Sequence, residues 1–317
     1  MPESRIGLVF VPSNPETTVR IIVDAEQRGV PMIWTITAGV TYDPISVFTV
    51  AAARTERIVV GTAIIQGFPR HPVALAMQAL ALEGFAPGRL RLGVGPSAER
   101  VMSGVYGIPS DKPVSRLKEY VTVARALLQD GKVDFDGEFY HVHAALPPGI
   151  TPPGTPVPIS ALRPPSYRAA GESADGALSW VTPPAYLRDV ALPALREGAR
   201  QANRPAPPLI AHVPVVLDAR RDVVLAAAQK TIGFYANLPH YIRMFNDAGY
   251  PVPGNGALPD ALVDALVVSG TNEMVEARLR ELLASGLDEL MVSLVPVADP
   301  ESERGALADI VAKIASE

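Results

Sequence analysis

Short apolar runs alternate with helical segments along this chain, most clearly in the unit from Arg57 to Gly95. Residues 58–65 form a β-branched, nearly uncharged run, as expected of a strand buried on both faces of a parallel sheet. Pro72 stands where a first helical turn tolerates a missing amide hydrogen, and residues 73–82 continue as an apolar helix. Residues 90–94 return as a strand, so the unit is predicted to be strand–helix–strand with parallel strands.

The same alternation continues to the end of the chain. The pattern predicts eight strands with helical segments between them, at residues 6–11, 32–36, 58–65, 90–94, 157–161, 176–180, 209–217 and 289–294. This order favours a (β/α)8 TIM barrel over a doubly wound sheet. We expect residues 1–317 to form a single domain of this kind, with insertions after strand 4 and before strand 8. The first insertion is a small hairpin at about residues 130–145, turned at Asp136-Gly137.

The composition excludes several classes of protein. The chain has no cysteine, so it has no disulfide, thiolate metal site, iron–sulfur cluster or cysteine nucleophile. A net charge of −5 argues against nonspecific nucleic-acid binding, which needs a basic face. No apolar run approaches the ~20 residues of a membrane-spanning helix, and the amino-terminal run is too short for a signal peptide. We therefore expect a cytoplasmic protein that binds a small-molecule substrate, and neither nucleic acid nor membrane.

The histidines give little sign of chemistry. His141 and His143 lie on one face of the predicted hairpin strand, which is compatible with metal binding, but no third ligand lies near them in the sequence. No metal site is therefore expected. His71 begins a helix, where hydrogen bonding to the backbone is favoured over a catalytic role. His212 and His240 are isolated in the sequence, and the usual hydrolase motifs are absent.

Chemistry in such a barrel gathers at the carboxyl ends of the strands. Gly95, Pro96 and Ser97 follow strand four and begin like a dinucleotide fingerprint, but Ala98 stands where its third glycine would be. Either this corner presents backbone amides to a ligand, with Ser97 capping the next helix, or it is only a tight turn.

Tryptophans and arginines also occur near strand ends. Trp34 in strand two and Trp180 at the end of strand six either pack in the core or line a pocket. Four arginines follow strand ends, where their charges could converge on an anionic ligand, although each alone is typical of a solvated surface: Arg70, Arg100, Arg163 and Arg168.

Together, several short motifs resemble the luciferase-like monooxygenase superfamily. They stand at residues 54–58 with 61–63, 70–72, 88–95, 104–107, 135–140, 169–176 and 238–241, and so extend over most of the chain. Within the superfamily, the chain is most similar to the branch of oxidoreductases that uses the deazaflavin coenzyme F420. Flavin mononucleotide (FMN) users share much of the pattern, so FMN is the alternative cofactor.

The resemblance implies a flavin-like ring bound at the carboxyl ends of the strands. Ala63 and Ile64 match the family's non-prolyl cis peptide, which backs the ring, and Thr37 and Gln66 match polar contacts at the ring edge. The wall beside the cofactor tail corresponds to Gly95, Pro96, Ser97 and Val101, and the phosphate loop to Ser160, Ala161, Leu162 and Arg163.

The chain also departs from its relatives. Deazaflavin sugar-phosphate dehydrogenases resemble this chain but carry an Asp-His pair and a Glu where it has Thr37-Ala38 and Ala98. Their phosphate-binding lysine corresponds to Pro183, which argues against sugar-phosphate oxidation. In the phosphate loop, Arg163 and two prolines replace the usual glycine. Either a side-chain cation replaces a backbone nest, or the cofactor binds weakly or not at all.

These features predict a deazaflavin-dependent oxidoreductase that transfers a hydride between F420 and a small, largely apolar substrate. The candidate substrate pocket comprises Trp34, Tyr42, Tyr106 and Trp180, and no catalytic residue is assigned. Water or a tyrosine such as Tyr42 or Tyr106 would supply a proton. The alternatives are an FMN-dependent monooxygenase and a catalytically degenerate barrel that binds a ligand. The apolar helices also permit a homodimer.

Overall fold

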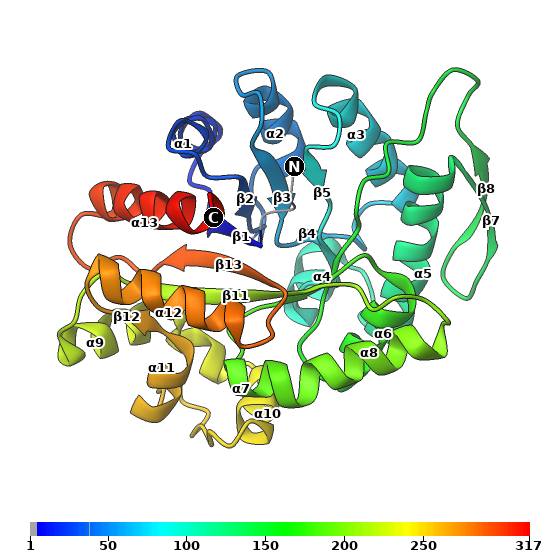
Figure 1. The fold of residues 1–317 in the computed structure, drawn as a ribbon. Helices are drawn as coiled ribbons and strands as arrows, with labels where there is room; N and C mark the ends of the chain where they lie inside the picture. The colour runs from blue at the N-terminus through cyan, green and yellow to red at the C-terminus, as the bar shows by residue number, and fades with distance from the viewer. Residues whose placement is uncertain (1–4, 38) are drawn as a thin grey trace.

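The strands of the barrel pair in parallel, and helices surround them (Figure 1). The computed structural model describes residues 5–37 and 39–317. Within this part of the chain, eight strand positions follow one another around the barrel: β1 (Ile6–Phe10), β2 (Met32–Thr35), β3 with β4 (Val59–Thr62, Ile65–Gln66), β5 with β6 (Leu90–Arg91, Val94–Gly95), β9 (Ile159–Ser160), β10 (Ala177–Ser179), β11 (Leu209–Val216) and β13 (Glu289–Leu294). β13 pairs with β1, which closes the circle and confirms the predicted (β/α)8 fold.

Two predicted strands are each split in the structure. Strand three breaks between β3 and β4 at the Ala63–Ile64 peptide bond, which is cis. Strand four breaks at Gly93, whose added Cβ would lie 1.9 Å from the carbonyl oxygen of Thr62. The Gly93 carbonyl accepts hydrogen bonds from Thr62 Oγ1 (2.7 Å) and from the amide of Ile65 (2.8 Å). The two breaks are therefore tied to each other across neighbouring strands.

Helices cover the outside of the barrel. Their bounds are α1 (Pro15–Gln27), α2 (Pro44–Ala52), α3 (Pro72–Phe85), α4 (Glu99–Tyr106), α5 (Pro113–Arg125), α6 (Pro164–Ser173), α7 (Pro184–Tyr186), α8 (Leu192–Gln201), α9 (Arg221–Ile232), α10 (Pro239–Asp247), α11 (Asp260–Leu266), α12 (Asn272–Ala284) and α13 (Pro300–Ala315). Shorter turns are π-helical at Ala126–Asp130 and Leu187–Ala191 and 3₁₀-helical at Gly233–Asn237.

Local chemistry explains where several helices begin. Asn14, Asp43 and Thr271 accept a hydrogen bond from a backbone amide in the first turn of α1, α2 and α12. His71 does the same for α3, since its Nδ1 accepts from the amide of Val73 (3.3 Å). The expected structural role of His71 is therefore confirmed.

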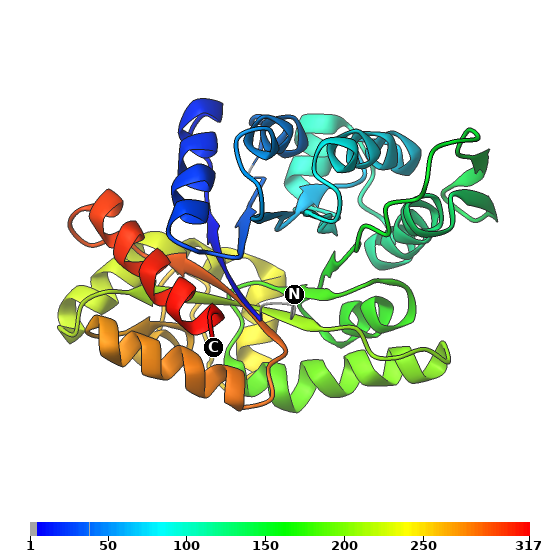
Figure 2. The same cartoon turned by 45° about the horizontal axis from the view of Figure 1, so that its top comes forward.

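Two insertions interrupt the alternation, as predicted. After strand four, β7 (Lys132–Asp136) and β8 (His141–Ala145) form an antiparallel hairpin, which stands at the edge of the molecule in both views (Figure 2). Before strand eight, α9, α10 and α11 precede β12 (Val268–Ser269), which pairs with β11 beside the main circle. In the part of the chain that the structure describes, no helix is both long and apolar enough to cross a membrane.

The interior of the barrel is filled in layers. Arg91, the last residue of β5, pairs with Glu289, the first residue of β13. Above them an apolar cluster occupies the middle: Val9, Met32, Trp34, Leu178, Ile210 and Met291. At the carboxyl ends of the strands, partly exposed side chains cover this cluster: Ile36, Ala63, Ile64 and Trp180. The end of the barrel where a ligand is expected is therefore apolar and accessible.

Candidate functional site

Residues from strands three, four and five meet at the carboxyl end of the barrel. A Cβ added to Gly95 would lie 2.5 Å from Ser160 Oγ and 2.8 Å from Ile64 Cδ1. The structure therefore brings Ile64, Gly95 and Ser160 together, and a side chain at position 95 would press against the other two. The Ala63–Ile64 bond beside them is cis, as the resemblance predicts.

Two polar side chains lie at the ends of neighbouring strands. Thr37 follows β2, and its hydroxyl oxygen is buried with no hydrogen-bond partner among the described residues. Gln66 ends β4 and is 4% exposed. A buried hydroxyl without a partner is unfavourable, and a ligand that supplies one removes the penalty. Thr37 and Ala38 stand where the sugar-phosphate enzymes carry an Asp-His pair, and of these two Ala38 lies outside the described residues.

The corner after strand four differs in one respect from expectation. Pro96, Ser97 and Val101 are partly exposed at this corner, as a cofactor wall requires. However, Ser97 does not cap α4: the capping position is Ala98, which makes no side-chain hydrogen bond there. Ser97 has a φ of 66°, a left-handed conformation unlike the extended backbone of a capping residue, which rules out this part of the first alternative.

In the predicted phosphate loop, the backbone amides that follow Ser160 are engaged within the protein. The amides of Leu162 and Arg163 both donate to Ser166 Oγ (3.0 and 3.2 Å), and that of Ser166 donates to the Arg163 carbonyl (3.0 Å). The amide of Ala161 donates to the Leu178 carbonyl (2.8 Å). The first two residues of α6 are prolines and have no amide hydrogen. Among the described residues 161–166, the backbone therefore offers no nest for a phosphate.

Side chains could take over this role. Arg163 forms an ion pair with Asp247 at the end of α10 (3.1 Å), yet its Nε is buried and has no partner in the described structure. Tyr186 is 4% exposed, and its hydroxyl is likewise buried without a described partner. Burial raises the pKa of Tyr186, and Asp247 raises it further while Arg163 lowers it, so this hydroxyl lies near both charges. Arg163 and Tyr186 thus retain unused hydrogen-bond donors beside the start of α6.

The four arginines singled out in the sequence do not converge. Arg70 donates to Asp43 and Gln78 (both 2.9 Å), which ties α2 to α3. Arg100 is exposed on α4, and Arg168 lies on α6 and lowers the pKa of Glu197 on α8, after stronger effects of Arg200 and Gln201. Of the four, Arg163 alone has a buried guanidinium nitrogen without a partner in the described residues.

The two tryptophans have different places. Trp34 is 1% exposed and packs in the apolar cluster inside the barrel, with the Arg91 guanidinium 5.5 Å from its ring centroid. For Trp34 the structure therefore favours core packing, one of the two alternatives left open by the sequence. Trp180 is partly exposed at the carboxyl end of β10 and remains a candidate for binding a ligand.

Trp180 is part of a contact chain that the sequence did not predict. Its ring stacks on His212, with ring centroids 3.6 Å apart and planes inclined by 11°. Trp180 Nε1 donates to the hydroxyl of Tyr235 (2.6 Å), and His212 Nε2 lies 2.8 Å from Ser293 Oγ. Trp180 directly follows β10 and His212 lies on β11, and the residues before them, Ser179 and Ala211, are paired across the two strands. Knowledge of this strand register would have revealed the contact.

The two candidate tyrosines lie elsewhere on the surface. Tyr42 is 54% exposed and lines an open groove of about 560 Å³ between α1 and α2, together with Val19 and Val50. Tyr106 is 40% exposed at the last position of α4. The ring contacts of Trp180 in the described structure do not include either tyrosine. Their assignment to a substrate pocket stays a prediction.

The hairpin histidines face carboxylates across the two strands. His143 Nδ1 lies 2.6 Å from Asp134 and His141 Nδ1 lies 3.1 Å from Asp136. The sequence did not suggest these partners, because they stand on the opposite strand. In residues 5–37 and 39–317, however, no group of three or more histidine and carboxylate side chains is arranged to hold a metal ion.

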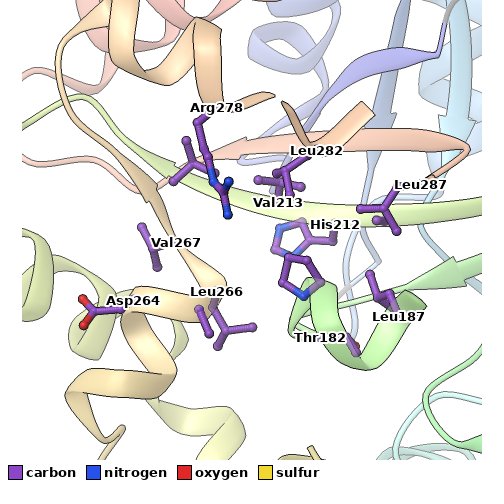
Figure 3. Close-up of a pocket in the computed structure, with 14 residues that line it drawn as sticks. Thr182, Leu187, His212, Val213, Asp264, Leu266, Val267, Arg278, Leu282 and Leu287 are labelled. Carbon is purple, nitrogen blue, oxygen red and sulfur yellow. The ribbon is translucent and has the colours of Figure 1, made fainter. Parts of the chain in front are cut away.

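A small pocket lies against β11 (Figure 3). His212 and Val213 from β11, Leu266 and Val267 from the end of α11, and Leu282 from α12 line it. Its volume of about 20 Å³ is room for about one water molecule. This pocket is therefore too small for a cofactor ring.

The comparisons with known proteins identify the family. The sequence profile of the luciferase-like monooxygenases matches residues 6–289. The chain therefore belongs to this family and is an oxidoreductase. An uncharacterized protein of Mycobacterium tuberculosis is 27% identical and covers 94% of this chain and 96% of its own length.

Two relatives have named activities. A 5,10-methylenetetrahydromethanopterin reductase of Methanolobus tindarius is 26% identical, over 90% of this chain and 92% of the relative. An F420-dependent glucose-6-phosphate dehydrogenase of Nocardia farcinica is 29% identical, over 88% of each chain.

Solved structures share the fold. An F420-dependent secondary alcohol dehydrogenase in complex with an F420–acetone adduct superposes with a TM-score of 0.80 at 18% identity, covering 98% of each chain. The oxygenating constituent of 3,6-diketocamphane monooxygenase from Pseudomonas putida, in complex with FMN, has a TM-score of 0.74 at 18% identity and covers 99% of this chain and 98% of its own. At this level of identity the likeness concerns the fold alone.

Proposed function

We propose that the protein is an F420-dependent oxidoreductase that transfers a hydride between the deazaflavin and a small, largely apolar substrate. The observation that carries this proposal is the apolar surface at the carboxyl end of the barrel, where Ile64, Gly95 and Ser160 meet in close packing. Such a surface suits one face of a planar ring, and the unpartnered hydroxyl of Thr37 suits a polar atom at the ring edge. When bound, the reduced deazaflavin supplies a hydride as a two-electron reductant.

The chain's own residues would bind and orient the two reactants. The side chains around Ile64 and Gly95 keep water from one face of the ring, and Trp180 offers an aromatic wall to the substrate. The cofactor tail is anionic, and the backbone of the phosphate loop is already engaged. We therefore assign the tail to the side chains of Arg163 and Tyr186, whose donors have no partner in the described structure.

A sugar phosphate does not fit this proposal. Pro183 stands where the sugar-phosphate enzymes place a lysine, and it is buried directly before α7. Ala98 replaces their glutamate. Without these charged groups, a phosphorylated substrate has no partner at the corresponding positions. An uncharged, compact acceptor such as an activated alkene, imine or carbonyl compound fits better.

Thermal unfolding tests the cofactor directly. A ligand that binds only the folded protein raises its stability by RT ln(1 + [L]/Kd), so its effect grows with concentration. We expect F420 to raise the melting temperature and FMN to do so much less. A large shift with FMN and none with F420 would indicate the alternative, an FMN-dependent monooxygenase. If neither cofactor shifts the transition, the third alternative, a degenerate ligand-binding barrel, gains support.

Replacement of Arg163 tests the assignment of the tail. Arg163→Gln removes the guanidinium and should weaken F420 binding about tenfold or more, since hydrogen bonds to charged groups contribute roughly 1.5–3 kcal/mol. Arg168→Gln, in the helix that Arg163 precedes, is the matched control and should leave the affinity unchanged. The measurement is an equilibrium titration followed by the fluorescence of F420. Equal affinities of both variants would refute the assignment.

A further inference from the structure

One contact chain runs across the carboxyl ends of strands six to eight. It joins Tyr235, Trp180, His212 and Ser293 through two hydrogen bonds and one ring stack. The side chain of Ser293 points into the barrel, like that of Met291 two residues before it, and it is partly exposed. Ser293 therefore stands at the same end of the barrel as the proposed cofactor face.

The hydrogen-bond partners of His212 fix its tautomer. The amide of Val181 donates to His212 Nδ1 (3.2 Å), so this nitrogen acts as an acceptor and carries no hydrogen. Burial lowers the pKa of His212 to about 3, so the ring is neutral around pH 7. A neutral histidine ring has one N–H hydrogen, and since Nδ1 has none, this hydrogen is on Nε2. His212 Nε2 therefore donates to Ser293 Oγ, 2.8 Å away.

This arrangement leaves the hydrogen of Ser293 unused. The hydroxyl oxygen accepts from His212 and cannot donate back to it. No other hydrogen bond of the Ser293 side chain exists within the described residues. His212 thus holds the oxygen in place, and the O–H bond is free to turn towards the end of the barrel.

We propose that Ser293 binds the substrate by donating its hydroxyl hydrogen bond to a neutral acceptor atom, and that His212 is the positioning residue that holds it. The substrate class is then a small compound with a carbonyl oxygen or an imine nitrogen, beside the aromatic face of Trp180. A neutral donor next to apolar side chains suits an uncharged acceptor, since an ion there would lose its hydration without a counter-charge. This inference rests on the proposed function, because it names the substrate class of the same site.

Two uncharged probes of similar shape test this inference. Cyclohex-2-en-1-one carries a carbonyl acceptor, and 1-methylcyclohexene has a methyl group in its place. Ligand-observed NMR titrations, with and without F420, give the affinity for each. Wild type should bind the enone about threefold to tenfold more tightly than Ser293→Ala does, as expected of one neutral hydrogen bond. The affinity for the hydrocarbon should be the same in both proteins. Ser293→Thr keeps a hydroxyl and should restore enone binding.

A pair of variants isolates the positioning role of His212. Both remove the ring that stacks on Trp180. The longer amide of His212→Gln can still reach Ser293 and donate to it, whereas the shorter amide of His212→Asn reaches only the Val181 amide. The enone should bind more tightly to His212→Gln than to His212→Asn. In wild type, ¹⁵N–¹H spectra of the histidine rings at pH 7 should show that His212 is neutral and carries its hydrogen on Nε2. The signal of His212 is the one that disappears in His212→Gln.

Three results would overturn the inference: equal enone affinity in wild type and Ser293→Ala, no measurable enone binding by wild type, or a His212 hydrogen on Nδ1. Its failure is distinct from that of the proposed function. Binding of F420 is measured separately by its fluorescence, and the enone comparison without F420 remains valid if the cofactor does not bind.

Discussion

Glu289→Ala should lower the free energy of unfolding by about 3–5 kcal/mol, the range for removing one partner of a buried ion pair. Glu289 Oε1 accepts from Arg91 Nη2 (2.9 Å), and the other oxygen of the carboxylate pairs with Nη1. The two side chains are only 12% and 13% exposed at the amino end of the barrel interior. The variant leaves the Arg91 charge buried next to Trp34 without its carboxylate. Chemical denaturation measures the loss.

A double variant provides the control for this pair. Arg91→Met with Glu289→Leu removes both charges and fills the space with apolar side chains, so it should recover most of the lost stability. A loss below about 1 kcal/mol in Glu289→Ala would contradict the account of the barrel interior, because it would mean that water reaches Arg91 easily.

Gly198→Ala should also be strongly destabilising, by about 3 kcal/mol, at the upper end of what overpacking usually costs. Helices α6 and α8 cross with their backbones in contact. A Cβ on Gly198 would lie 2.0 Å from the Arg168 carbonyl oxygen, and one on Gly171 would lie 2.1 Å from that of Leu195. Because these obstacles are backbone atoms, they cannot move aside as a flexible side chain does. The helices must separate, which also displaces the start of α6 where Arg163 lies.

Gly84→Ala is the matched control for this crossing. Gly84 lies in α3, and an added Cβ there would have no neighbour within 4 Å. This variant should gain about 0.5–1 kcal/mol, since alanine favours a helix over glycine. If Gly198→Ala and Gly84→Ala change the free energy of unfolding by the same amount, the close crossing of α6 and α8 is wrong.

The strands were predictable because burial determines their sequence. Residues 58–65 and 209–217 are almost entirely apolar, because neighbouring elements cover both faces of a parallel strand. The breaks at Ala63–Ile64 and Gly93 could not be located from hydrophobic pattern alone; the first came from the family resemblance. Only Met102 of the eight residues of α4 is buried, so this helix adds little to the apolar core that the pattern predicts.

The candidate site was predicted less completely. The resemblance identified Ile64, Gly95 and Ser160, and the structure brings them together. It could not predict that Ser166 engages the amides of the phosphate loop, because this depends on a side-chain rotamer. His212 seemed isolated because its partner Ser293 is 81 residues away in the sequence. Contacts across neighbouring barrel strands become visible only when the register is known.

The structure of the protein in complex with F420 tests the central claim most directly. We predict the deazaflavin ring at the carboxyl end of the barrel, against Ile64 and Gly95, with the phosphate of its tail bound by Arg163. Binding of the ring away from these residues, or a site that accepts FMN but not F420 under the same conditions, would contradict the account.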